Sequence, residues 1–147
     1  MKQVDTFEYV SMLKGLVEEG HEVSMIVSGN SMSPFICHGR DSIYFKAPDR
    51  ELKVGDMVFY QRPSGQYVMH RICGIKEDGY AIVGDAQQVI EYPVKREQIF
   101  ALVTKVKRKG SELRPGSFWW EFFARVWVRI IPLRPLMHKL YSLFRHK

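Results

Sequence analysis

The chain has 147 residues, of which 46% are hydrophobic and 26% are charged. This length fits one domain, and the composition excludes a disordered or collagen-like chain. Six Lys and Arg residues against one acid give residues 118–147 a charge of +5 out of the formal +6. The same segment holds all three Trp residues and many of the other aromatic ones. We therefore expect an N-terminal helix at 1–21, one domain at 22–110 and a distinct basic, aromatic tail at 111–147.

The sequence shows neither a membrane-spanning segment nor a secretory signal. Glu121 and Arg125 interrupt the most apolar stretch, so it does not reach the roughly 18 to 20 apolar residues that a spanning helix needs. Residues 1–16 contain acids and lack the apolar core of a signal peptide. We expect a cytoplasmic protein, peripheral at most to the inner face of the membrane. There Cys37 and Cys73 should be reduced and buried, and no metal or other cofactor is expected.

The pattern of apolar residues predicts a helix followed by short strands. An amphipathic helix is expected over 6–19, with Asp5 and Glu8 as its capping box. Beyond it, runs rich in β-branched and aromatic residues indicate strands. We place these strands at 22–28, 42–46, 56–61, 66–75, 80–83 and 98–107. Hairpin turns are expected at 63–65 and at Asp78-Gly79, so the domain should be mainly β.

Ser31 and His70 are the first candidates for chemistry. Ser31 follows the first expected strand in a polar turn, and a serine becomes a nucleophile only with a base in hydrogen-bond reach and a donor for the oxyanion. Alternation along the strand at 66–75 places His70 on the same, buried face as Val68 and Ile72. A histidine in that position is more often a core residue than a base, so this pair alone does not establish catalysis.

Four short motifs follow one another along the chain: Ser31-Met32-Ser33-Pro34, Gly55-Asp56, His70-Arg71-Ile72 and Gly84-Asp85. In this order they resemble the type I signal peptidases and the wider family that includes LexA-like self-cleaving repressors. The resemblance covers about residues 23–107. Most bacterial members and the repressors have a lysine where His70 stands. The sequence is therefore most similar to the endoplasmic-reticulum and spore-former branch, which pairs serine with histidine.

The resemblance implies the catalytic β fold of this family and a set of roles. Ser31 would be the nucleophile, His70 its general base, and Asp85 the acid that orients the imidazole. Glu91 is the alternative acid, because this branch often carries further acids a few residues after the second Gly-Asp motif. The backbone N–H of Ser31 would donate to the oxyanion, since Gly29 stands where some bacterial members carry a helper hydroxyl.

Neighbouring positions receive structural or substrate-binding roles. Met32 and Pro34 are expected to shape the turn and line the substrate cleft. Asp56 is expected only to cap backbone N–H groups in a tight turn. The remaining loop acids are expected to be solvated charges; these are Asp41, Asp49 and Glu51.

Together the motifs predict a serine endopeptidase that cleaves a peptide or propeptide after small residues. Its activity should rise between about pH 6 and 7.5, where an imidazole of ordinary pKa loses its proton. A peptide-binding module that keeps the fold without cleaving is the alternative. A self-cleaving repressor is disfavoured, because residues 1–28 are too few for a DNA-binding domain and no Ala-Gly or Cys-Gly pair precedes Ser31.

The tail is expected to begin with an amphipathic helix over 118–131, in which Arg125 and Arg129 belong to a narrow polar stripe beside a wide apolar face. Pro132 and Pro135 should interrupt it before a second short helix. The apolar face either packs on the β domain or lies on an anionic membrane surface, and the sequence leaves both open. A nucleic-acid partner is not expected, because bulky apolar residues dilute the basic ones.

Overall fold

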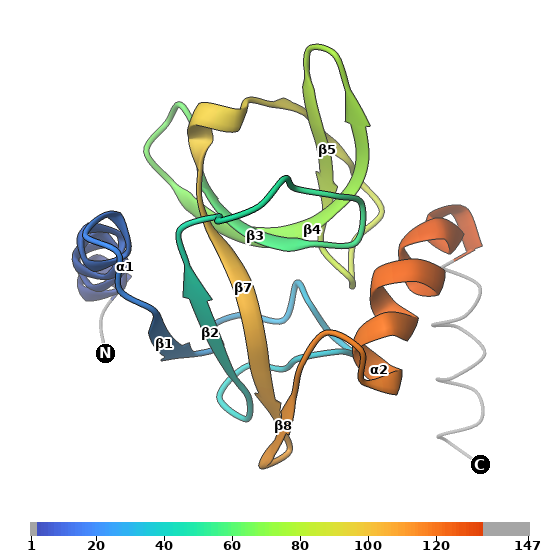
Figure 1. Cartoon of the computed structure of the whole chain (residues 1–147), viewed down its shortest axis with the longest axis horizontal. Coiled ribbons are helices and arrows are strands. Elements are labelled where there is room, and N and C mark those ends of the chain that lie inside the picture. Colours follow the sequence, from blue (N-terminus) through green and yellow to red (C-terminus); the bar gives the residue numbers. More distant parts are fainter. Residues whose placement is uncertain (1–2, 134–147) are drawn as a thin grey trace.

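The computed structural model describes residues 3–133 and shows an antiparallel β sheet with helices on two opposite sides (Figure 1). Helix α1 spans Gln3–Glu18. The strands are β1 Val23–Ile26, β2 Ser42–Lys46, β3 Met57–Gln61, β4 Tyr67–Lys76, β5 Gly79–Val83, β6 Glu91–Val94, β7 Ile99–Arg108 and β8 Ser111–Leu113. The helical elements after α1 are η1 Arg96–Gln98, α2 Phe118–Glu121, η2 Phe122–Val126 and η3 Trp127–Leu133. A mainly β architecture with a helix near each end is therefore confirmed.

Strand β7 occupies the middle of the sheet although it comes late in the chain. The strand order is β1-β2-β7-β3-β4-β5-β6, and β8 pairs with β7 beside this path. Every pair is antiparallel. Phe100 and Val103 of β7 contribute to one apolar cluster, and Leu102 contributes to a second one. Strand β7 therefore contributes side chains to both cores.

Both predicted hairpin turns are present. The N–H of Arg62 donates to the carbonyl of Gln66 at 2.8 Å and closes the β3–β4 turn, where Gly65 has a φ of +97°. Glycine adopts such a positive φ without steric cost. Lys76 pairs with Gly79 across the β4–β5 turn. The two turns make β3, β4 and β5 one meander, and His70 lies in its central strand.

Several element boundaries differ from the sequence-based expectation. Helix α1 begins at Gln3, so Asp5 lies inside its first turn instead of capping it. Strand β1 is shorter than expected, and β6 and β8 were not expected at all. Strand β6 contains Pro93, which fits its place at the sheet edge because proline cannot donate to a ladder. The second tail helix expected after Pro135 lies outside the described residues.

The helical segment at 118–133 packs on the β domain through one face. Trp120, Phe123 and Trp127 are buried in the same apolar cluster as Phe35 of the β1–β2 loop. The rings of Phe35 and Phe123 lie 4.9 Å apart between centroids. Of the two alternatives for the tail, packing on the domain therefore holds for this face.

The other face of the same segment is open to solvent. Phe118 is 71% exposed, and Trp119 and Val126 are exposed as well. Within residues 3–133, no helix has both the length and the apolar character that crossing a bilayer requires.

Candidate active site

Ser31 lies in the loop between β1 and β2, where the chain passes through consecutive tight turns. The N–H of Ser33 donates to the carbonyl of Asn30 at 3.1 Å, and the N–H of Ile36 donates to the carbonyl of Met32 at 3.1 Å. These bonds hold the residues on both sides of Ser31 in a compact arrangement. The side chain of Ser31 is half-buried there.

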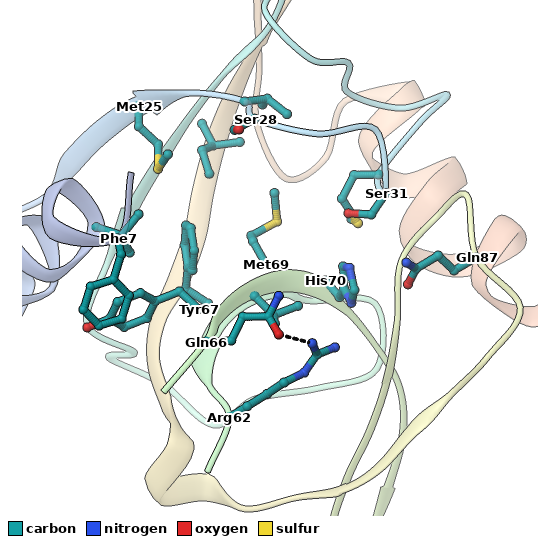
Figure 2. Close-up of a pocket in the computed structure, with 16 residues that line it drawn as sticks. Phe7, Met25, Ser28, Ser31, Arg62, Gln66, Tyr67, Met69, His70 and Gln87 are labelled. Carbon is teal, nitrogen blue, oxygen red and sulfur yellow. Dashed lines mark hydrogen bonds between the residues drawn. The ribbon is translucent and has the colours of Figure 1, made fainter. Parts of the chain in front are cut away.

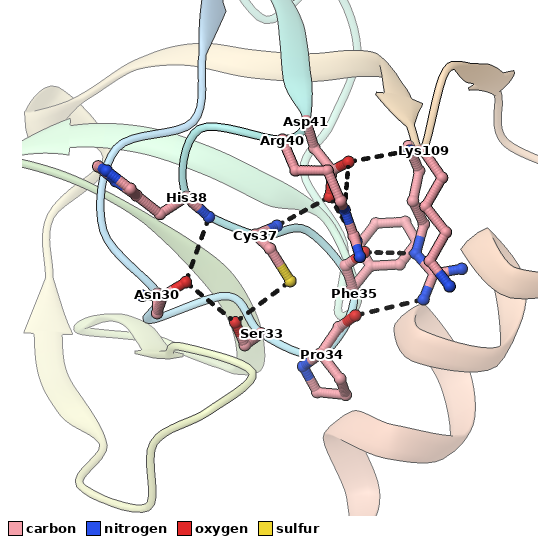
Figure 3. Close-up of polar contacts among 10 residues, drawn as sticks. Asn30, Ser33, Pro34, Phe35, Cys37, His38, Arg40, Asp41 and Lys109 are labelled. Atoms are coloured by element: carbon pink, nitrogen blue, oxygen red, sulfur yellow. Dashed lines mark hydrogen bonds and ion pairs between the residues drawn. The ribbon is translucent and has the colours of Figure 1, made fainter.

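Asp41 anchors the far end of this loop (Figure 3). Its buried carboxylate accepts hydrogen bonds from Nε and Nη2 of Arg40 at 2.8 and 2.7 Å, and from the N–H groups of Cys37 and Lys109 at 2.8 and 2.9 Å. Burial alone would raise the pKa of Asp41, but these hydrogen bonds outweigh it and lower the pKa. The expectation that Asp41 is a solvated charge was wrong, because a carboxylate can close the loop by accepting backbone N–H groups that would otherwise lack partners.

His70 lies in the middle of β4 and pairs with Val58 of β3. The side chain is 7% exposed, and Val68 and Ile72 are buried too, which confirms the strand face predicted for these three residues. Burial and, to a smaller extent, the charge of Arg62 lower the pKa of His70 to about 4, although the charge of Glu91 partly opposes them. At neutral pH the imidazole is therefore uncharged, the form that accepts a proton.

Ser31 and His70 line the same pocket, which has a volume of about 650 Å³. In Figure 2, Ser31 enters from the β1–β2 loop and His70 from β4, on opposite walls. Met32 lines the pocket as predicted. Pro34 is exposed and outside the pocket lining, and its carbonyl accepts a hydrogen bond from Arg108 at 3.3 Å. Pro34 therefore shapes the loop but does not line the cleft as expected.

Asp85 has a different partner from the one expected. Its two carboxylate oxygens accept hydrogen bonds from Nε and Nη2 of Arg71, each at 2.8 Å, and both side chains are fully buried. Nη1 of Arg71 donates to the carbonyl of Gly55 at 2.9 Å. Successive residues of β4 point to opposite faces, so Arg71 lies on the other face of the strand from His70. Asp85 pairs with Arg71 and not with His70. This ion pair takes the place of the expected Asp85–His70 contact.

The Gly84-Asp85 segment instead holds the loop that carries Ser31. The N–H of Ala86 donates to the carbonyl of Ser31 at 2.9 Å. A Cβ at Gly84 would lie 2.5 Å from the same carbonyl, so only glycine allows this close approach. Nε1 of Trp127 donates to the carbonyl of Asp85 at 2.8 Å. The second Gly-Asp motif is thus a positioning element between the loop that carries Ser31 and the C-terminal helical segment.

Glu91, the alternative acid, lies on β6 beside a second pocket of about 640 Å³ that His70 also lines. It accepts hydrogen bonds from the hydroxyl of Tyr60 at 2.8 Å and from Nη2 of Arg62 at 2.8 Å. Burial would raise the pKa of Glu91, but these hydrogen bonds lower it, so Glu91 carries a negative charge near His70.

Arg62 and Gln87 line both pockets next to His70, and the sequence analysis missed them. Arg62 directly precedes the predicted 63–65 turn. That position indicates that the side chain of Arg62 lies near the end of the hairpin. It does not indicate the ion pair with Glu91 of β6. The position of Gln87 has no local signal, because it depends on how the β5–β6 loop folds back.

The remaining predicted residues do not line either pocket. Asp56 accepts hydrogen bonds from the N–H of Lys53 at 2.8 Å and from both terminal nitrogens of Arg50 at 2.9 Å, which confirms its place as a turn cap. Asp49 and Glu51 are exposed as expected. The two cysteines are half-buried, not buried as expected; these are Cys37 and Cys73.

Within the described part of the chain, no group of three or more His, Cys, Asp or Glu side chains is arranged to hold a metal ion. Comparison with protein-family models, curated proteins and solved structures found no match.

Proposed function

We propose that this protein is a serine endopeptidase of the signal-peptidase-like class, with Ser31 as nucleophile and His70 as general base. One observation carries the proposal: a single pocket joins a serine from a tightly folded loop with a buried, uncharged imidazole from a strand. A core histidine with no chemical role would not need to face a cavity that also holds a serine hydroxyl.

The chemistry proceeds in two half-reactions. Oγ of Ser31 bonds to the scissile carbonyl carbon while its proton passes to the ring of His70, and the imidazolium then protonates the leaving amine. A water molecule next attacks the acyl group with His70 again as base, which releases the product acid and restores Ser31. The backbone N–H of Ser31 is the proposed oxyanion donor. We assign Glu91 the stabilisation of the imidazolium, because its charge favours the protonated form of His70.

The proposed substrate is an extended peptide or propeptide that lies along β1. Among residues 3–133, β1 pairs only with β2, so its other edge has backbone groups free for a further strand. Met25 of β1 and Val27 just beyond it line the pocket that leads to Ser31. Small side chains at the first and third positions before the cut fit beside Met32, which lies buried next to the nucleophile.

A serine-directed fluorophosphonate probe tests the assignment. The probe should label Ser31 in the wild-type protein, leave Ser31→Ala unlabelled and leave His70→Ala nearly unlabelled. Ser33→Ala is the matched control, since the Ser33 hydroxyl bonds within the loop, to Asn30 at 3.5 Å. Labelling of Ser31→Ala at the wild-type rate would contradict the proposal. Peptide binding without labelling or cleavage would favour the non-cleaving, peptide-binding alternative.

We also propose that the open face of the C-terminal helical segment rests on an anionic membrane surface. Phe118, Trp119 and Val126 are exposed there, and the guanidinium groups of Arg125 and Arg129 are exposed on the same segment. Aromatic and arginine side chains suit the membrane interface, where apolar rings enter and cations meet lipid phosphates. A cytoplasmic location on the inner face of the membrane stays a prediction.

A further inference from the structure

The pocket that holds Ser31 and His70 extends well beyond them. Its far part is lined by apolar side chains from α1, β1, β3 and β4, among them Phe7, Val10, Met25, Phe59, Tyr67 and Met69. In Figure 2, Phe7 and Tyr67 lie at one end, and Ser31, His70 and Gln87 lie at the other. Ser31, His70 and Gln87 therefore mark the reacting end. The end next to α1, here called the α1 compartment, is lined mainly by apolar side chains, and the polar side chains of Arg62 and Gln66 lie along its border.

The walls of the α1 compartment are held in place by specific contacts. The hydroxyl groups of Ser11 and Tyr67 lie 2.9 Å apart in a hydrogen bond that ties α1 to β4. The rings of Phe7 and Tyr67 are 5.2 Å apart, and Tyr67 meets Phe100 edge-on at 5.7 Å. A wall fixed from three elements does not need to rearrange before it binds a side chain, so the compartment is preformed.

The size and chemistry of the compartment indicate its occupant. A pocket of about 650 Å³ is far larger than two small side chains require. A charged side chain would lose its hydration among these apolar walls, whereas an apolar side chain gains free energy by leaving water. We propose that the α1 compartment binds a bulky apolar or aromatic side chain of the substrate, beyond the small residues next to the cut. This inference rests on the proposed peptidase function and deepens it.

Strand geometry restricts where that side chain lies in the substrate. In an extended peptide, residues two apart share one face. The first and third residues before the cut carry the small side chains that face the pocket near Ser31. The same face then presents the fifth and seventh residues, so the bulky side chain belongs at one of these odd positions.

Binding of fluorescent peptides to the Ser31→Ala protein tests this position without turnover. The peptides carry Ala at the first and third residues before the cut, polar residues elsewhere, and a single Leu moved through the fourth to seventh positions. Leu at the fifth or seventh position should tighten binding about 10-fold, as burial of one large apolar side chain predicts. Leu at the fourth or sixth should have no effect. Equal affinity for all the peptides would overturn the inference.

Two matched variants of Ser31→Ala link the preference to the α1 compartment. Phe7 is 49% exposed and lines the pocket, whereas Met12 is 54% exposed on the same helix and does not line it. Adding Phe7→Asp should remove the Leu preference, and adding Met12→Asp should leave it intact. Equal loss in both variants would contradict the inference. Cleavage of the same peptides by the wild-type protein tests the proposed function separately. A binding preference for Leu without cleavage would refute the proposed peptidase activity alone. Cleavage without a preference for Leu would refute the proposed role of the α1 compartment alone.

Discussion

Burial keeps the imidazole of His70 neutral by lowering its pKa, and two charged neighbours act on that pKa with opposite sign. Arg62 lowers its pKa and Glu91 raises it. With a pKa of about 4, the base is available over the whole neutral range, so kcat/KM should rise near pH 4 to 5 and not between about pH 6 and 7.5. Arg62→Gln should move this rise to higher pH, and Glu91→Gln to lower pH. The pH dependence of peptide cleavage measures both shifts, and a shift in the same direction for both variants would contradict this account.

The same group makes folding stability depend on pH. An unfolded chain protonates His70 below about pH 6.5, whereas the folded protein does so only near pH 4. The unfolded state therefore binds more protons between these values, and the free energy of unfolding should fall by up to about 3 kcal/mol as pH drops through them. Urea denaturation at several pH values measures this.

Two substitutions isolate the contribution of His70. His70→Asn should flatten the pH dependence above about pH 4.5. His21→Asn should not, because the side chain of His21 is exposed. Asp41 and Glu91 have lowered pKa values, so their contribution to stability is lost at lower pH than that of His70.

At the scale of residues, the local sequence pattern predicted that the side chain of His70 is buried but did not predict which residues pair with Asp85 and Asp41. Alternation alone placed His70 on the buried face, and this was correct. The carboxylate of Asp85 pairs with Arg71 because of the way β4 lies against the β5–β6 loop. The spacing of residues in the sequence does not reveal this arrangement. The buried position of Asp41 was missed for the same reason, since one of its partners is the N–H of Lys109 in the distant β7–β8 turn.

At the scale of elements, the β1–β2 loop depends on Asp41 for its shape. Asp41→Asn removes the charge that meets Arg40 and weakens two backbone hydrogen bonds, so it should destabilise the protein by about 2 kcal/mol. It should also raise the hydrogen exchange of the Ser33 and Ile36 amides and slow labelling of Ser31. Hydrogen exchange with mass spectrometry checks the loop.

The control for this variant is Asp49→Asn, because Asp49 is exposed and pairs with Lys46 at the surface. A surface pair contributes little, so Asp49→Asn should leave both stability and exchange near the wild-type values. Equal exchange of the loop amides in the two variants would show that Asp41 does not hold the loop.

Strands with clear turn signals were predictable and the others were not. The 63–65 and Asp78-Gly79 turns have residues that favour tight reversal, so β3, β4 and β5 were placed within one or two residues. Strand β6 lacks alternation and contains Pro93, and β8 has only three residues. The position of β7 between β2 and β3 is a long-range pairing, which local propensity does not reveal.

At the scale of the whole molecule, the C-terminal helical segment has one face in the core and one face in solvent. Deleting it would remove buried Trp120 and Trp127, so surface substitutions are the sharper test of membrane binding. Phe118→Ser with Trp119→Ser should weaken binding to phosphatidylglycerol vesicles about 10-fold or more, because two exposed rings no longer enter the interface.

Vesicle co-sedimentation measures this, with phosphatidylcholine vesicles and raised salt as conditions that should also weaken binding. Ile75→Ser is the control, since Ile75 is an exposed apolar residue on β4. If the wild-type protein does not co-sediment with anionic vesicles, the membrane proposal is refuted, whereas the peptidase proposal is unaffected.

The central place of β7 also affects how the chain folds as it is synthesised. Before Ile99–Arg108 leaves the ribosome, β1–β2 and β3–β6 have no strand to join them, and β2 and β3 each expose an edge. Open edges pair readily with other chains, so this interval is the one in which a nascent chain risks aggregation. A ribosome-stalled chain ending before Ile99 should bind a hydrophobic dye strongly, and one extended past the helical segment should not. The strand that completes the sheet therefore sets the moment at which Ser31 and His70 can come together, because they belong to the two halves that β7 joins.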